Sequence, residues 1–104
     1  MRKLLIGLTI LSSMSSFAGS YYTTDNRGTE IKQTVGQVII ENGYLVIMPK
    51  STGTVCDISL SVLKQLGIDP LLLGKTLKNT RRAKLQCKQD GNKILNKEGF
   101  RLSF

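Results

Sequence analysis

The strongest constraint on the fold is the pair Asn42-Gly43, which separates two runs of apolar and mostly β-branched residues. Asn-Gly favours a two-residue type I′ turn, because both turn residues must adopt positive φ. The sequence therefore predicts a hairpin over residues 37–48. Its second strand ends at Pro49, which has no N–H to give to a ladder. The predicted register pairs Glu41 with Tyr44, Ile40 with Leu45, Ile39 with Val46 and Val38 with Ile47.

Both faces of this hairpin are apolar at the centre. A half-solvated sheet would instead alternate apolar and polar residues along each strand. The hairpin is therefore expected either to lie between two layers of the same domain or to be covered by a second subunit. The second possibility makes a homo-oligomer formed through the hairpin one of the expected assemblies.

A short helix is predicted after a loop over residues 51–55. Asp57 or Ser59 is the candidate N-cap. Gly67 lies where a left-handed C′ residue belongs, and Ile68 would then contact Leu63, as a Schellman motif requires. The apolar stripe of the helix consists of Leu60, Leu63 and Leu66.

Beyond residue 68 the signals are shorter. Asp69-Pro70 is typical of an N-cap followed by N1, and we expect it to open a single turn that Gly74 closes. Residues 75–84 are expected to form a loop or a frayed helix. Asp90-Gly91 predicts a second hairpin over residues 85–95, with Cys87 opposite Ile94. Residues 100–104 alternate in polarity and predict a closing strand.

The N-terminus predicts export. Two basic residues precede an apolar run over residues 4–11, and Ser16-Phe17-Ala18 is typical of a signal-peptidase site, so we expect a signal peptide over residues 1–18. No later stretch approaches the roughly 20 apolar residues that a membrane-spanning helix needs. We therefore expect a soluble protein that is periplasmic or secreted. Residues 19–34 are polar and lack periodicity, so they are expected to form a flexible leader.

The two cysteines, Cys56 and Cys87, predict a disulfide. Removal of 18 residues from 104 leaves 86, and a domain of that size has a marginal core. An even pair of cysteines in an exported chain is normally oxidised. A bridge between positions 31 residues apart would stabilise the fold by about 3–4 kcal/mol. Two buried free thiols are the alternative.

Basic residues are concentrated in the last third of the chain. The whole sequence has a formal net charge of +8, and residues 19–69 contribute −1 while residues 70–104 contribute +7. Such asymmetry indicates an anionic partner. The candidate partner-binding residues are Lys75, Lys78, Arg81, Arg82, Lys84 and Lys88. A solvated loop that only aids solubility is the alternative.

Several chemistries are excluded by what the sequence lacks. It has no histidine, so a Ser-His or Cys-His relay cannot form within one chain. With its cysteines bridged it also lacks a zinc-type ligand set, and it has no phosphate-binding glycine motif. We therefore expect no catalytic residues, no metal and no cofactor. Nucleic acid is the weaker of the anionic partners, because base stacking requires aromatic residues interleaved with the basic ones.

One stretch resembles a known family. The hairpin, the loop Ser51-Thr52-Gly53, the strand that follows and the helix ending in Leu66-Gly67-Ile68 are similar to the first half of a retropepsin-like aspartic protease. The resemblance covers residues 36–70. It implies an enzyme-like fold built around the loop. Ser51 stands where that family has its catalytic aspartate, and two aspartates sharing a proton are needed to activate water, so the resemblance implies no activity.

These observations predict one small α+β domain over residues 35–104, consisting mainly of antiparallel sheet with one short helix. The expected function is that of an exported, non-catalytic, inhibitor-like or immunity-like binding protein. Its partner would be an acidic protein or an anionic envelope polymer. The alternative is a degenerate retropepsin-like domain without activity.

Overall fold

The predicted hairpin is formed by β2 (Glu30–Glu41) and β3 (Tyr44–Pro49) in the computed structural model, which describes residues 17–104. Asn42 and Gly43 adopt φ of 53° and 82°, as the turn requires. The register from Val38 to Glu41 is the predicted one. The hairpin prediction is therefore confirmed, although β2 begins well before residue 37.

The short helix is confirmed together with its stop signal. β4 (Cys56–Ser59) leads directly into α2 (Leu60–Gln65), so Ser59 is the N-cap and Asp57 lies in the strand. Gly67 has φ of 70°. The amide of Ile68 donates to the carbonyl of Leu63 at 2.8 Å, and that of Gly67 donates to Lys64 at 3.1 Å. These two bonds form the predicted Schellman motif.

The single turn expected after Asp69-Pro70 is wrong, because that turn is the start of a longer helix. α3 (Pro70–Asn79) has Asp69 as its N-cap, and the amide of Leu71 donates to the Asp69 carboxylate at 3.1 Å. Gly74 does not end the helix. Leu73 and Leu77, one helical turn apart, are buried in the core, and this burial outweighs the cost of about 1 kcal/mol for a glycine inside a helix.

The prediction of a flexible leader over residues 19–34 is also wrong. Residues 20–24 form β1 (Ser20–Thr24), which pairs antiparallel with the first half of β2. Tyr21 and Thr23 are fully buried. Tyr and Thr favour strands, and here their alternation places one side of β1 against the core. The folded domain therefore includes residues 20–34, which the sequence predicts to be part of a flexible leader. The predicted signal peptide lies outside the described residues, apart from Phe17 and Ala18.

The second hairpin, over residues 85–95, does not form. Residues 84–86 form β5 (Lys84–Gln86), which pairs parallel with β1 and antiparallel with β7 (Arg101–Ser103), the predicted closing strand. A 3₁₀ turn, η2 (Asp90–Asn92), leads into β6 (Lys93–Ile94), which pairs parallel with β4. A second 3₁₀ turn, η3 (Lys97–Gly99), precedes β7.

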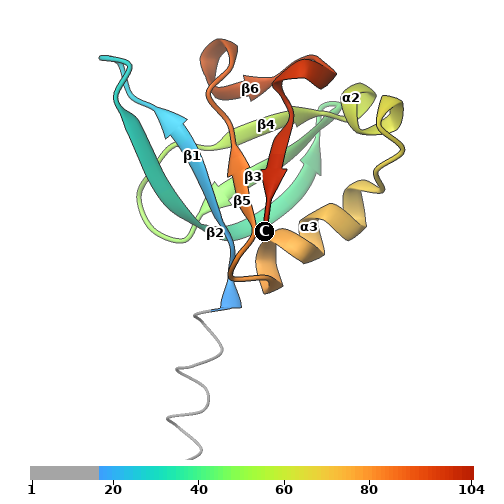
Figure 1. Ribbon diagram of the computed structural model, residues 1–104, viewed down its shortest axis with the longest axis horizontal. Helices are drawn as coiled ribbons and strands as arrows, with labels where there is room; N and C mark the ends of the chain where they lie inside the picture. Colours follow the sequence, from blue (N-terminus) through green and yellow to red (C-terminus); the bar gives the residue numbers. More distant parts are fainter. Residues whose placement is uncertain (1–16) are drawn as a thin grey trace, which may run out of the picture.

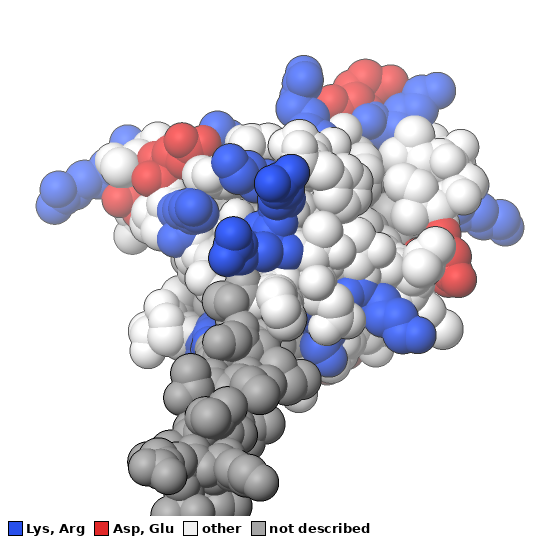
Figure 2. All heavy atoms as spheres, turned by 60° about the horizontal axis from the view of Figure 1, so that its bottom comes forward, with Lys and Arg blue, Asp and Glu red and all other residues white. Residues whose placement is uncertain are grey.

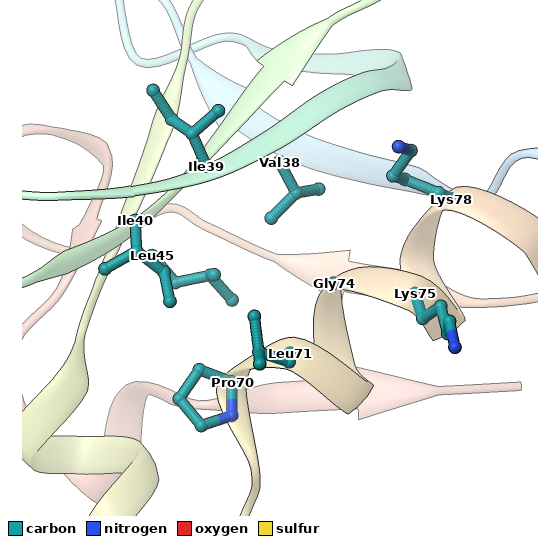
Figure 3. A pocket seen from close by; sticks show the side chains of 9 residues that line it. All are labelled: Val38, Ile39, Ile40, Leu45, Pro70, Leu71, Gly74, Lys75 and Lys78. Atoms are coloured by element: carbon teal, nitrogen blue, oxygen red, sulfur yellow. The ribbon is translucent and has the colours of Figure 1, made fainter.

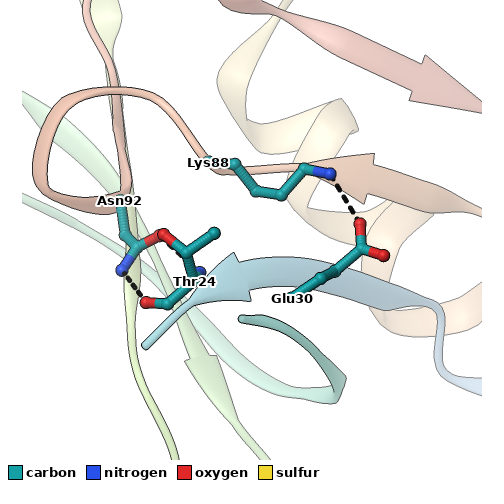
Figure 4. Close-up of polar contacts among 4 residues, drawn as sticks. All are labelled: Thr24, Glu30, Lys88 and Asn92. Carbon is teal, nitrogen blue, oxygen red and sulfur yellow. Dashed lines mark hydrogen bonds and ion pairs between the residues drawn. The ribbon is translucent and has the colours of Figure 1, made fainter. Parts of the chain in front are cut away.

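The side chain of Asn92 shows why the local hairpin does not form. It accepts from the amide of Thr24 and donates to the carbonyl of Thr24, both at 2.9 Å (Figure 4). The Asn92 amide group therefore pairs with the end of β1 as a neighbouring strand would. The amide of Cys87 donates to the carbonyl of Tyr22 at 2.8 Å and continues the same pairing.

Together the strands form one curled sheet in the order β6-β4-β3-β2-β1-β5-β7, with α3 packed against the second half of β2 (Figure 1). The fold class is α+β, as predicted. The Cys56–Cys87 disulfide is present, with Cα atoms 6.1 Å apart, and it joins the start of β4 to the end of β5. Among residues 17–104 there is no free cysteine.

The core lies inside the curl. It contains Tyr21, Val35, Leu45, Ile47, Ile58, Val62, Leu63, Leu73, Leu77, Leu85 and Ile94 with the disulfide. Leu45 and Ile47 place one face of the hairpin in this core. Ile39 and Val46, on the other face, are only half-buried.

Candidate anion-binding face

The six predicted cations lie on different elements of the fold. Lys75 and Lys78 lie on α3 beside an apolar groove. Arg81 and Arg82 occupy the turn between α3 and β5, and Lys84 is the first residue of β5. The structure therefore distributes the basic segment over α3, the turn that follows it and β5.

Lys88 is occupied by an acidic neighbour. Its Nζ lies 2.6 Å from a carboxylate oxygen of Glu30, at the start of β2 (Figure 4). The two side chains are 38% and 49% exposed, so the pair contributes little to stability. Its main effect is to neutralise one charge of the predicted site.

A different set of cations comes together on the outer face of the sheet. Side chains of directly paired residues point to the same face. One row across the strands consists of Lys32, Tyr22, Gln86 and Arg101. The next row consists of Thr34, Ser20, Lys84 and Ser103. Three strands thus contribute Lys32, Lys84 and Arg101 to one surface, with the half-buried ring of Tyr22 between them.

Lys50 and Arg81 extend this surface. Together with Lys32 they line a shallow cavity of about 370 Å³, whose other walls include Gly19, Ser20 and Thr34. Lys50 is held there because its amide donates to the carbonyl of Thr34 at 2.9 Å. We call the five cations Lys32, Lys50, Arg81, Lys84 and Arg101 the basic face. In the view of Figure 2, several Lys and Arg side chains lie near the centre, whereas Asp and Glu side chains lie toward the margins.

The basic face has no internal neutralisation. Within residues 17–104 the Lys88–Glu30 pair is the only ion pair, so none of the five cations has a carboxylate oxygen within 4.0 Å. Like charges on one surface repel one another and favour the arrival of an anion. Ammonium and guanidinium groups around hydroxyl groups can bind carboxylate, phosphate or sulfate through charge-assisted hydrogen bonds.

Sequence reasoning missed three of these five residues. Lys32 lies in the segment assigned to a leader, Lys50 follows the first hairpin, and Arg101 lies in the closing strand. Lys32 and Lys50 are 18 residues apart in the sequence, Lys50 and Arg101 are 51 apart, and Lys32 and Arg101 are 69 apart. Only the order of the strands in the sheet brings them together. The alternation of Lys32 with Gln33 and Thr34 was the one local signal that could have placed Lys32 on a sheet face.

The Ser51-Thr52-Gly53 loop is held by buried polar groups. The side-chain amide of Gln33 donates to Thr23 at 2.9 Å and to the carbonyl of Thr54 at 3.0 Å. The hydroxyl of Tyr21 donates to the same carbonyl at 2.7 Å. Burial raises the pKa of Tyr21 well above its usual value of 10.0.

Gly53 is needed in this loop for reasons of space. A Cβ atom at position 53 would lie 1.9 Å from Oε1 of Gln33, and that oxygen accepts from the amide of Thr54. Ser51 itself is exposed. The loop is therefore a structural connection fixed by Gln33, and its polar contacts all point toward the sheet.

Among residues 17–104, no group of three or more Cys, Asp or Glu side chains lies close enough to hold a metal ion. In the same part of the chain, no helix has the length and apolar character needed to cross a membrane. In comparisons with protein-family models, curated proteins and solved structures, nothing matches this chain.

Proposed function

We propose that the protein is an exported, non-catalytic binding protein whose basic face docks an acidic partner protein or an anionic envelope polymer. The observation that carries the proposal is the convergence of five cations on one surface, none of them paired with a carboxylate within residues 17–104. Their mutual repulsion opposes folding, and an anionic ligand removes it.

The predicted export site supports the same face. Cleavage after Ala18 would make Gly19 the first residue, with a positively charged amino group. Gly19 and Ala18 both line the cavity with Lys32, Lys50 and Arg81. Processing would therefore remove one wall residue from this cavity and add a positive charge to its edge.

Charge reversal tests the proposal. We expect the purified protein to be retained on immobilised heparin and to bind lipopolysaccharide micelles. The double variant Lys84→Glu with Arg101→Glu should elute at lower salt, and its log affinity should fall less steeply with log salt, by about two or more in slope. The matched control is Arg27→Glu with Lys97→Glu, which changes the net charge equally at the β1–β2 turn and in η3.

Equal losses in the two double variants would show that net charge alone causes retention, and would contradict a specific face. Selective loss in the first variant on polyglutamate, with no binding to lipopolysaccharide, would assign an acidic protein as the partner. The reverse pattern would assign the envelope polymer.

The alternative is a degenerate retropepsin-like domain. It is supported by the element order of hairpin, loop, strand and helix over β2, β3, β4 and α2. Restoring the missing aspartate with Ser51→Asp should then give a peptidase that pepstatin inhibits. A folded Ser51→Asp protein without such activity would count against this kinship and leave the binding proposal intact.

A further inference from the structure

The second half of β2 has a free edge. β1 pairs with β2 only as far as Thr34, and the contact continues to Val35, whose amide donates to the carbonyl of Gly19 at 2.9 Å. Residues 37–41 pair with β3 on one side. No strand among residues 17–104 pairs with them on the other side.

The backbone groups on this edge belong to Val38 and Ile40. In an antiparallel ladder, hydrogen-bonded and non-hydrogen-bonded pairs alternate, and a two-residue turn is flanked by a hydrogen-bonded pair. That pair is Glu41–Tyr44, so Ile40–Leu45 and Val38–Ile47 are non-bonded pairs. The amides and carbonyls of Val38 and Ile40 therefore point away from β3. No other backbone group within residues 17–104 forms a hydrogen bond with these amides and carbonyls on the side away from β3.

An apolar groove of about 350 Å³ runs between this edge and α3 (Figure 3). Two of its apolar side chains remain in contact with solvent, since Ile40 is 49% exposed and Leu71 is 71% exposed. The principal apolar residues of the groove are Val38, Ile40, Leu45, Pro70, Leu71 and Gly74.

Gly74 sets the distance between the helix and the strand. A Cβ atom at this position would lie 3.2 Å from Cγ1 of Val38, tighter than ordinary van der Waals contact. α3 is therefore close to β2 at Val38, and the groove opens toward Pro70 and Leu71. A side chain at position 74 would fill the floor of the groove. The glycine inside this helix therefore keeps the groove open.

The groove has a charged end. Lys75 and Lys78 lie at the end near Val38, whereas Pro70 and Leu71 lie near Ile40 and Leu45 (Figure 3). None of the groove-lining residues in the described part of the chain is Asp or Glu. Its chemistry is therefore apolar at one end and cationic at the other, with strand-type donors and acceptors along one wall.

We infer that this groove binds an extended peptide segment by strand addition to β2, with apolar residues toward Pro70 and anionic residues toward Lys75 and Lys78. The unpaired amides and carbonyls of Val38 and Ile40 supply the main-chain hydrogen bonds. Pockets for alternate side chains supply selectivity, because side chains along a strand alternate between faces. The groove is separate from the basic face, so the inference does not depend on the proposed function.

We infer a peptide and not another ligand because a peptide backbone can form hydrogen bonds with the free edge of β2. An anionic amphiphile would fit the apolar floor and the two lysines, but it would leave the amides of Val38 and Ile40 without partners. A second copy of the chain is the other competitor, since two β2 edges could pair with each other.

The test uses fluorescein-labelled heptapeptides of alternating Val and Thr that end in two Glu residues, in both chain orders, because the added strand can run in either direction. We expect one order to bind in fluorescence polarisation. Binding should slow hydrogen exchange of the Val38 and Ile40 amides in nuclear magnetic resonance spectra. N-methylation of one alternating set of peptide amides should weaken binding at least about tenfold, and N-methylation of the other set should have little effect, because only one set faces β2.

Protein variants sharpen the result. Ile40→Pro removes an amide that points away from β3, so the β2–β3 ladder remains and peptide binding should be lost. Ile40→Val keeps that amide and is the matched control. Lys75→Glu with Lys78→Glu should weaken the Glu-ended peptide about tenfold and strengthen a Lys-ended one. Arg27→Glu with Lys97→Glu, which changes the net charge equally outside both the groove and the basic face, should leave peptide binding unchanged.

Three outcomes would overturn the inference. One is equal tolerance of both N-methylation patterns with competition by dodecanoate, which would assign an amphiphile. Another is slow exchange at Val38 and Ile40 in a dimer without peptide, which would assign a second copy. The third is the absence of binding by either peptide to a folded protein.

Discussion

The buried hydroxyl of Tyr21 donates a hydrogen bond to the carbonyl of Thr54, in the loop over residues 51–55. Ionisation of this hydroxyl makes the stability of the fold depend on pH. The folded pKa is raised above the unfolded value of 10.0, so the folded state holds its proton longer than the unfolded state does. The contribution is fully present below pH 10 and is lost as pH rises toward the folded pKa.

We therefore expect Tyr21→Phe to cost about 1 kcal/mol in the free energy of unfolding at pH 7, because the hydrogen bond to Thr54 is lost. Above pH 10 the wild-type protein should lose up to about 1.4 kcal/mol per pH unit relative to this variant. Urea denaturation of both proteins at pH 7 and pH 11 checks the sign. A difference that stays constant between the two pH values would contradict it.

The structural role of a residue could be predicted from the sequence where it acts on near neighbours in the chain. It could not be predicted where the residue's partner is distant in the sequence. Asn42, Gly67 and Asp69 act on neighbours within a few positions, so a turn, a stop and a cap could be placed. Gln33 is a polar residue in a polar segment, and nothing around it indicates the contact with Thr54, 21 positions away.

At the scale of elements, α3 was predicted too short because Gly74 was expected to end it. The other errors concern strands that pair with β5 or β7, far away in the sequence. Asp90-Gly91 has the composition of a hairpin turn, but β5 pairs with β1 and β7, and the residues after it form η2 and β6 instead of a return strand. The same pairing explains why residues 20–24 resemble a leader when they are examined alone. The basic face depends on these strands, so it could not be predicted as a unit.

The position of β1 in the sheet gives a direct test. β1 lies between β2 and β5, and its removal would uncover Leu85 and separate β5 and β7 from the rest of the sheet. We expect a protein that begins at Val35 to lack a cooperative thermal transition by circular dichroism. A protein that begins at Gly19 should retain it. A sharp transition in the shorter protein would show that residues 19–34 are dispensable, as a leader would be.

At the scale of the whole molecule, the disulfide connects the two halves of the curled sheet. Cys56 opens β4 on one side of the sheet order, and Cys87 follows β5 on the other. The bridge closes a segment of 31 residues, which in the chain-entropy model stabilises the fold by about 3–4 kcal/mol. For a sheet with few helices to cover it, that contribution is a large share of a typical net stability.

The parallel pairing of β1 with β5 also has a consequence for the timing of folding. β1 pairs with β2 a few residues later in the chain, but its second partner comes much later, since Ser20 also pairs with Lys84, 64 residues away. Pairings this distant slow folding, since the loop must close before any contact forms. Tyr21 is directly paired with Leu85, so one side of its surroundings is completed only when β5 is available. We therefore expect the β1–β5 pairing, and with it the edge of the sheet formed by β5 and β7, to form only after most of the chain has been synthesised.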